Sequence, residues 1–186
     1  IEDTTAPAIA SEAVNMTVEC DGEGNTAALN GWLASNGGAG AASDICGGVT
    51  WSNDFTALSD DCGATGSATV IFTATDDCGN PTSTTATFTI EDTIAPSMDT
   101  ESSNLTVECD GEGNQAELNN WLNSNGGASA SDDCSSVTWS NNFEGLSDLC
   151  GATGAATVVF TATDDCGHST STTATFTIED TLAPSM

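Results

Sequence analysis

Residues 68–76 read ATVIFTATD and residues 86–90 read ATFTI. Apolar and polar residues alternate strictly in both segments, which predicts two half-buried β-strands. The residues expected on the buried side are Val70, Phe72, Ala74, Ala86, Phe88 and Ile90. Most intervening residues are Thr, which suits a β surface that faces water. Gly79, Asn80 and Pro81 lie between the segments and predict a turn, so the two strands form a hairpin.

Two further strands are expected before this hairpin. In VNMTVEC (14–20), Val14, Met16, Val18 and Cys20 share one face, and in GGVTWSNDF (47–55) Val49 and Trp51 point inward. The stretch NTAALNGWLASNGG (25–38) breaks the alternation, because Leu29, Trp32 and Leu33 have helical spacing. We expect a short helix with Asn25 as N-cap, ended by Gly37 and Gly38, and the same helix around Leu118, Trp121 and Leu122. These aromatic residues are interpreted as core side chains.

One acidic heptad occurs three times, as IEDTTAP (1–7), IEDTIAP (90–96) and IEDTLAP (178–184). When the heptads are aligned, residues 1–89 match residues 90–177 almost residue for residue. We therefore predict one Ig-like repeat at 1–89, a second at 90–177, and the start of a third at 178–186. The fold class expected is all-β, with tandem Ig-like β-sandwich repeats that each contain a short helical insert and two disulfides. Without an initiator Met, a leader or a long apolar run, the chain reads as an interior piece of a mature secreted protein.

The charge composition is one-sided. The chain has no Lys or Arg against 28 Asp and Glu, a formal net charge of −28. Such a surface repels phosphate backbones and anionic headgroups, which argues against binding to nucleic acid or to a membrane surface and against membrane insertion. Most of these carboxylates are expected to form a solvated acidic coat.

Eight cysteines fall four to a repeat, which argues for disulfides and an oxidising compartment and not for a structural zinc site. If consecutive elements alternate in direction, the cysteines separate into two ends of each repeat. We call the end with the heptad and the 76–82 turn the upper pole, and the opposite end the lower pole. The predicted pairs are Cys20 with Cys62, Cys46 with Cys78, Cys109 with Cys150, and Cys134 with Cys166.

The same alternation gathers acids at the upper poles, where carboxylates repel one another unless a cation lies among them. Calcium is the expected cation, because it takes six to eight oxygen ligands and is abundant outside cells. The predicted ligands at the joints are Glu2, Asp3, Asp44, Asp76 and Asp77 in the first repeat, and Glu91, Asp92, Asp132, Asp133, Asp164 and Asp165 in the second. A calcium ion held by the heptad and the loops of the next repeat would stiffen the connection.

A second candidate calcium site is the DGEGN motif, which spaces oxygen side chains like the start of a calcium loop. Its residues are Asp21, Glu23 and Asn25, and Asp110, Glu112 and Asn114. Trp32 and Trp121 stand at position 12 of that register in place of the bidentate Glu, so an EF-hand is excluded. The alternative is a polar turn that caps the helix.

With its heptad, its FTATDDCGN turn and its ATFTIEDT strand, the chain resembles the immunoglobulin-like repeats, related to the hyalin repeat, of large surface proteins of gliding and marine Bacteroidota. The resemblance covers both repeats. It implies a secreted adhesin or surface filament, and O-glycosylation at Thr4, Thr93 and Thr181. The helical insert and the CGH sequence at 166–168 depart from the common pattern.

The function expected is therefore a non-enzymatic structural repeat at the cell surface, stiffened by calcium and disulfides. Its expected partners are neighbouring repeats of the same chain, other copies in a fibre, and surface glycans. The alternative is a glycan- or ice-binding adhesion module that uses the hydroxyl ladders Thr85, Thr87, Thr89 and Thr173, Thr175, Thr177. An enzyme is disfavoured, since His168 is the sole histidine and stands where the first repeat has Asn80.

Overall fold

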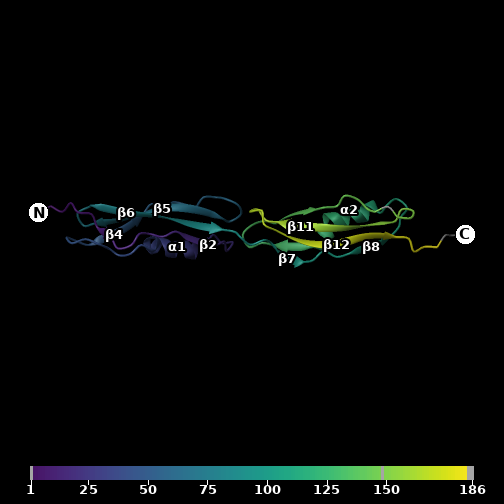
Figure 1. The fold of residues 1–186 in the computed structure, drawn as a ribbon, viewed down its shortest axis with the longest axis horizontal. Coiled ribbons are helices and arrows are strands. Elements are labelled where there is room, and N and C mark those ends of the chain that lie inside the picture. The colour runs from purple at the N-terminus through teal and green to yellow at the C-terminus, as the bar shows by residue number, and fades with distance from the viewer. Residues whose placement is uncertain (1, 148, 184–186) are drawn as a thin grey trace. The chain divides into compact units, whose positions relative to one another are not determined.

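The computed structural model describes residues 2–147 and 149–183. The chain divides into two compact units, Ile1–Thr93 and Ile94–Met186. Each unit has the same order of elements along the chain (Figure 1).

The first unit is built on a four-stranded sheet. Its elements are β1 (Ala8–Ile9), β2 (Met16–Glu19), helix α1 (Thr26–Ala34), the 3-10 turn η1 (Asn36–Gly38), β3 (Ala42–Ser43), β4 (Val49–Asn53), β5 (Gly66–Asp76) and β6 (Pro81–Glu91). The sheet order is β2-β6-β5-β4, and β1 pairs with β3 in a separate two-stranded sheet. Strand β2 is parallel to β6, whereas β5 is antiparallel to both β4 and β6. The strand directions expected from the sequence are thus confirmed.

The second unit repeats this plan. Its elements are β7 (Ser97–Thr100), β8 (Leu105–Glu108), helix α2 (Gln115–Asn123), η2 (Asn125–Gly127), β9 (Ser129–Ser131), β10 (Thr138–Asn141), β11 (Gly154–Thr163) and β12 (Ser169–Glu179). The sheet order is β10-β11-β12-β8, with β8 parallel to β12, and β7 pairs with β9. The fold class is therefore as predicted, all-β Ig-like units that each carry a short helix.

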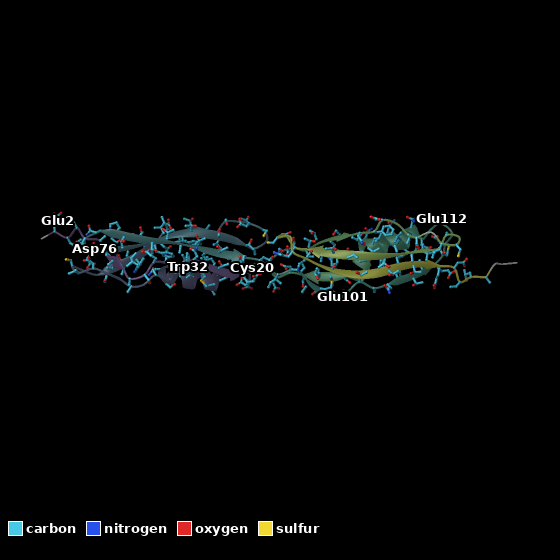
Figure 2. The ribbon with its side chains drawn as sticks, in the orientation of Figure 1. Glu2, Cys20, Trp32, Asp76, Glu101 and Glu112 are labelled. Atoms are coloured by element: carbon cyan, nitrogen blue, oxygen red, sulfur yellow. The ribbon has the colours of Figure 1, made fainter. Side chains whose placement is uncertain are left out.

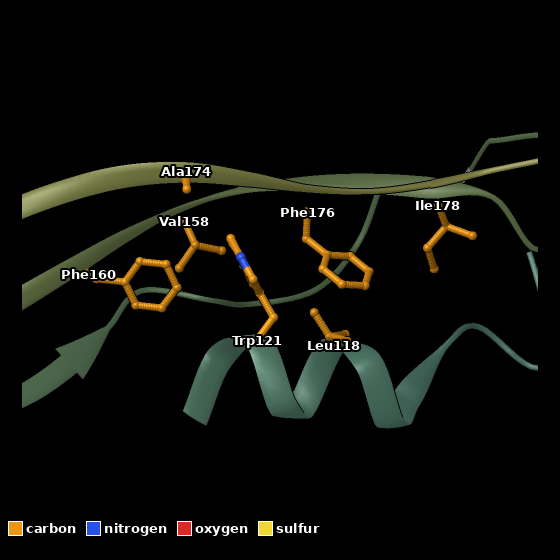
Figure 3. Close-up of a cluster of buried hydrophobic side chains, with 7 residues drawn as sticks. All are labelled: Leu118, Trp121, Val158, Phe160, Ala174, Phe176 and Ile178. Carbon is orange, nitrogen blue, oxygen red and sulfur yellow. The ribbon is translucent and has the colours of Figure 1, made fainter. Parts of the chain in front are cut away.

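The core lies between the helix and the sheet. In the first unit Phe72 and Phe88 are fully buried, and the ring of Trp32 meets Phe72 edge-on with centroids 5.1 Å apart. Figure 3 shows the same arrangement in the second unit, where Trp121 and Leu118 on α2 reach toward side chains on the sheet. The indole nitrogen of Trp32 donates a hydrogen bond to the Val14 carbonyl oxygen at 3.1 Å, which satisfies the polar atom of the buried side chain.

The inward positions predicted on β5 and β6 are buried as expected, but two local predictions differ from the structure. The side chain of Val14 is 61 % exposed, because the strand begins only at Met16. Asn25 immediately precedes α1, yet it has a left-handed backbone and its side chain makes no capping bond to the helix. Its amide donates instead to the Glu19 carbonyl oxygen at 2.8 Å, so Asn25 ties the helix start to β2.

The glycines after α1 have a steric role. Gly37 is buried with a φ of 68°, and a Cβ atom there would lie 2.7 Å from a ring carbon of Phe72. Only a residue without a side chain allows the chain to turn this close to the core.

The cysteines differ from the prediction at four positions. Cys20 and Cys62 in the first unit, and Cys134 and Cys166 in the second, are disulfide-bonded. Cys46, Cys78, Cys109 and Cys150, for which we predicted two further bridges, are thiols. The oxidised cysteines thus belong to the lower pole in the first unit and to the upper pole in the second.

Candidate metal centre

The upper pole of the first unit brings part of the predicted acidic cluster together. Asp3 comes from the first heptad, and Asp44 and Cys46 come from the loop between β3 and β4. One ligand atom from each of these three residues lies within 4.8 Å of the other two. Both aspartates are half-buried, and Cys46 is exposed. The heptad and the body of the repeat therefore contribute one carboxylate each to a single anionic cluster.

Local hydrogen bonds fix the two carboxylates. Oδ1 of Asp3 accepts the Thr5 backbone N–H at 3.0 Å, and Oδ1 of Asp44 accepts the Cys46 backbone N–H at 2.7 Å. These are Asx turns, in which the side chain bonds the backbone two residues on. A carboxylate has about four lone-pair sites on its two oxygens, so each can accept such a bond and still bind a cation.

Asp76 holds the turn between β5 and β6. Its side chain is buried, with Oδ1 accepting the backbone N–H groups of Cys78 and Asn80 at 2.9 and 2.8 Å. Oδ2 accepts the Asn80 side-chain amide at 2.8 Å, and this bond is the largest cause of the lowered pKa of Asp76. The same amide donates to the Asp3 carbonyl oxygen at 3.2 Å. Asp76 thus positions the heptad through Asn80.

The other acids predicted at this pole lie outside the three-residue cluster. Oδ2 of Asp77 accepts the Gly48 N–H at 2.7 Å and connects the β5–β6 turn to the start of β4. Glu2 is exposed, and Figure 2 shows Glu2 and Asp76 at the same end of the first unit.

The two thiols at this pole report its negative field. The carboxylate of Asp3 is the largest cause that raises the pKa of Cys46, followed by burial and by Asp44. The pKa of Cys78 is raised by burial first and then by Asp3 and Asp76. A raised thiol pKa means that a second negative charge is disfavoured there. The neighbouring carboxylates therefore favour the neutral form of both thiols.

The second unit repeats the local bonds of this pole. Asp132 accepts the Cys134 and Ser135 backbone N–H groups at 2.9 and 3.0 Å, and Asp165 accepts the Ser136 hydroxyl at 2.9 Å. Asp164 is buried, and its Oδ2 lies 3.1 Å from Nδ1 of His168, the residue that replaces Asn80. The remaining residues predicted as ligands differ in exposure: Asp92 is buried, whereas Glu91 and Asp133 are exposed.

The DGEGN motif forms a closed polar turn in each unit. Oδ1 of Asp21 accepts the backbone N–H groups of Asn25 and Glu23 at 2.8 and 2.9 Å, and these bonds, with Asn25 first, lower the pKa of Asp21. In the second copy Oδ1 of Asp110 accepts the backbone N–H groups of Asn114 and Glu112. Glu23 and Glu112 are exposed. Among the residues that the structure describes, none of the motif's acids belongs to a cluster of converging ligand atoms. A polar turn that precedes the helix accounts for these contacts.

In each unit, a glutamate that sequence reasoning missed holds the next heptad along the chain at the lower pole. Oε1 and Oε2 of Glu19 accept the backbone N–H and the hydroxyl of Thr93, both at 2.8 Å. Glu108 receives the same two bonds from Thr181, at 2.8 and 2.7 Å. The repeated TVEC motif, which places these glutamates at the end of β2 and of β8, was the available signal.

A groove of about 490 Å³ lies between α1 and the segment around Val14. Its walls are Val14, Asn15, Met16, Ala27, Ala28, Gly31, Trp32, Ser35, Gly37 and Gly38. These side chains include no carboxylate, imidazole or thiol, so the groove has no acid–base group for catalysis.

None of the described helices is long and apolar enough to cross a bilayer.

Comparisons with known proteins identify no family. No protein-family model matches the chain, and no curated protein matches it. Similar solved structures include Drosophila N-cadherin EC1-4, at 11% identity and a TM-score of 0.36 over 95% of this chain and 50% of that one. Protocadherin gammaB7 EC3-6, from a cis-dimer structure, has 14% identity and a TM-score of 0.32 over 100% of this chain and 55% of that one.

Mouse Cadherin-23 EC22-24 is 11% identical, with a TM-score of 0.33 over 94% of this chain and 67% of that one. The chain thus spans about half the length of the first two structures.

Proposed function

We propose that this chain is a non-enzymatic, extracellular structural region of a cell-surface adhesin or filament, stiffened at its heptads by calcium and within its repeats by disulfides. It comprises repeats at 1–89 and 90–177 and the start of a third at 178–186. One observation carries the calcium proposal: Asp3 of the first heptad and Asp44 of the same repeat converge, in a chain with no Lys or Arg.

Electrostatics makes a divalent cation the natural partner of this cluster. Two carboxylates at a separation of about 5 Å repel by about 3 kcal/mol at an effective dielectric constant of 20, and solvent reduces this further. The sequence has no Lys or Arg to relieve the repulsion. Asp3 and Asp44 would supply carboxylate oxygens, and carbonyl oxygens and water would complete the shell that calcium requires. The affinity expected is that of extracellular modules, about 10⁻⁴ to 10⁻³ M.

The same proposal extends to the second heptad through the internal repeat. Asp92 corresponds to Asp3, Asp132 to Asp44, and Asp164 to Asp76. Each heptad would then be the place where calcium connects consecutive repeats. Such a connection serves a stalk or fibre, whose partners would be neighbouring repeats, other copies of the chain and surface glycans.

The cysteines support an extracellular compartment. Four of them are disulfide-bonded in the structure, and disulfides persist in oxidising surroundings outside the cytosol. The acidic surface would keep a secreted protein soluble, since net charge far from zero opposes association. Two observations support a non-enzymatic role. The groove beside α1 has no acid–base side chain, and Asp76 and Asp164 bond residues of their own turns.

Calcium titration of the full chain, followed by thermal unfolding with and without EDTA, tests the proposal. At 10 mM calcium and a Kd of about 1 mM, binding adds about 1.4 kcal/mol, which is a rise in Tm of about 6 to 11 °C for a unit of this size. The variant with Asp3→Asn and Asp44→Asn should lose the part of this shift that belongs to the first unit.

A matched control removes the same charge elsewhere. Glu12→Gln with Asp60→Asn changes two exposed acids and should keep the full calcium response. If wild type, cluster variant and control respond equally to calcium, or if none responds, the stiffening mechanism is wrong.

A second candidate function rests on the outer face of the sheet. Thr87 on β6 pairs in register with Thr69 on β5, and their hydroxyl oxygens lie 2.9 Å apart. Thr157 and Thr175 make the equivalent contact at 3.0 Å. These ordered hydroxyls favour a glycan- or ice-binding face. Glycan arrays and ice-recrystallisation assays test it, and a null result in both would exclude this function.

A further inference from the structure

Each repeat ends in a two-point contact between a glutamate and a heptad threonine. Strand β2 runs parallel to β6 with Glu19 in register with Glu91, and the Cys20 N–H donates to the Glu91 carbonyl oxygen at 2.8 Å. Thr93 follows Glu91 by two residues and so lies on the same side of the extended chain. The Glu19 side chain reaches it with both carboxylate oxygens, one on the amide and one on the hydroxyl.

The second unit provides an independent copy of this geometry. Glu108 is in register with Glu179 on the parallel pair β8 and β12, and the Cys109 N–H donates to the Glu179 carbonyl oxygen at 2.8 Å. Thr181 then gives its amide and its hydroxyl to the two oxygens of Glu108. The contact therefore belongs to the repeat.

The bonds are of the strong class. An ionised carboxylate shortens and strengthens the hydrogen bonds that it accepts, and two bonds from one residue also fix its orientation. The pKa of Glu108 is lowered, and the largest cause is the Thr181 hydroxyl, followed by the Thr181 amide. The ionised form is thus the one that the threonine stabilises.

We propose that the pairs Glu19–Thr93 and Glu108–Thr181 form a carboxylate fork that fixes the direction in which the heptad leaves each repeat. The threonine hydroxyl is consequently a structural donor and is not an acceptor for an O-linked sugar while the repeat is folded. A sugar on Oγ1 would replace the donated hydrogen and place bulk against the glutamate. Only the biological role of the fork rests on the proposed stalk function, because the contact itself involves no calcium.

Amide hydrogen exchange in the full chain, measured by NMR in the presence of EDTA, tests the fork. The Thr93 and Thr181 amides should both be protected, although the residues are exposed. Glu19→Ala should accelerate exchange of the Thr93 amide about tenfold or more and leave Thr181 unchanged as an internal control. Glu108→Ala should have the reverse effect.

The hydroxyl half of the fork is tested separately. Thr93→Val should change the residual dipolar couplings of residues 91–93, whereas Thr93→Ser should retain them. Exchange of both wild-type amides at the rate of an open chain would overturn the fork. Recovery of folded native protein with sugar on Thr93 or Thr181 and full amide protection would overturn the exclusion of glycosylation. Because EDTA is present throughout, loss of the calcium response leaves this result unaffected.

Discussion

The disulfide state of the chain provides the sharpest test of the repeat symmetry. The positions that are oxidised in one unit are thiols in the other, although the surrounding sequences match. The local contacts match as well: the Gly22 N–H lies 3.4 Å from Sγ of Cys20, and the Gly111 N–H lies 3.4 Å from Sγ of Cys109. We therefore expect all four predicted bridges when the chain folds in an oxidising compartment.

The same agreement is found at the second cysteine of the lower pole. The Thr65 hydroxyl donates to the Cys62 carbonyl oxygen at 2.6 Å, and the Thr153 hydroxyl donates to that of Cys150 at 2.7 Å. The backbone around the Cys150 thiol is thus held as it is around the disulfide-bonded Cys62.

Chain entropy sets the expected magnitude. Each bridge closes a loop of about 30 to 40 residues, which stabilises a unit by about 4 kcal/mol in the chain-entropy model. For a domain of this size, that corresponds to a fall in Tm of about 15 to 30 °C when one bridge is lost. The double variants Cys20→Ser with Cys62→Ser and Cys109→Ser with Cys150→Ser should therefore be destabilised similarly, each in its own unit.

The assay combines thiol titration of the denatured, unreduced protein with peptide mapping and thermal unfolding. We expect no titratable thiol and the four pairs predicted from strand direction. Four titratable thiols in protein from an oxidising compartment, together with an unchanged Tm for the Cys109 and Cys150 double variant, would refute the reasoning from repeat symmetry.

Three further predictions concern the core, the helix end and acid stability. Trp121→Ala should lower the free energy of unfolding of the second unit by about 3 to 5 kcal/mol in urea, because the indole is 5 % exposed and packs on Phe160; an effect below 1 kcal/mol would contradict the packing. Gly37→Ala should lower the free energy of unfolding by about 1 to 3 kcal/mol, because the residue has a positive φ and its new Cβ atom would clash with Phe72. The control is Gly31→Ala, at an exposed mid-helix position with open space around it, which should raise the free energy of unfolding by about 1 kcal/mol. Changes of the same sign in the two variants would refute the steric argument. Asp21, Asp76 and Asp110 have pKa values lowered from 3.8, so their contribution to stability is present above that pH and is lost as the pH falls through the lower folded pKa. Asp21→Asn should therefore flatten the decline of Tm with acid. An unchanged profile of Tm against pH would contradict the stabilising role of the Asp21 carboxylate.

Part of the site could be foreseen because it depends on local pattern and on strand direction. Asp3 and Asp44 were expected at one pole from the alternation of elements, and the structure brings their ligand atoms together. Asp76 was expected beside them as a ligand, but its oxygens are used by Cys78 and Asn80 in the turn. The sequence pattern places a carboxylate at one pole of the repeat, but it does not show which N–H groups donate hydrogen bonds to that carboxylate.

The amino-acid sequence by itself determined the repeat, the strands with Phe72 and Phe88 inward, the helix with Trp32 in the core, and the lack of Lys and Arg. These features follow from periodicity and composition, which act over a few residues or over the whole chain. Only the tertiary structure decided that Val14 is exposed. It also decided that the Asn25 amide donates a hydrogen bond to the Glu19 carbonyl oxygen on β2, and that the Glu19 carboxylate accepts the Thr93 hydroxyl. The last contact joins residues 74 positions apart, because β2 lies parallel to β6. A local sequence pattern does not predict which residue a side chain on one strand contacts beyond the end of the neighbouring strand.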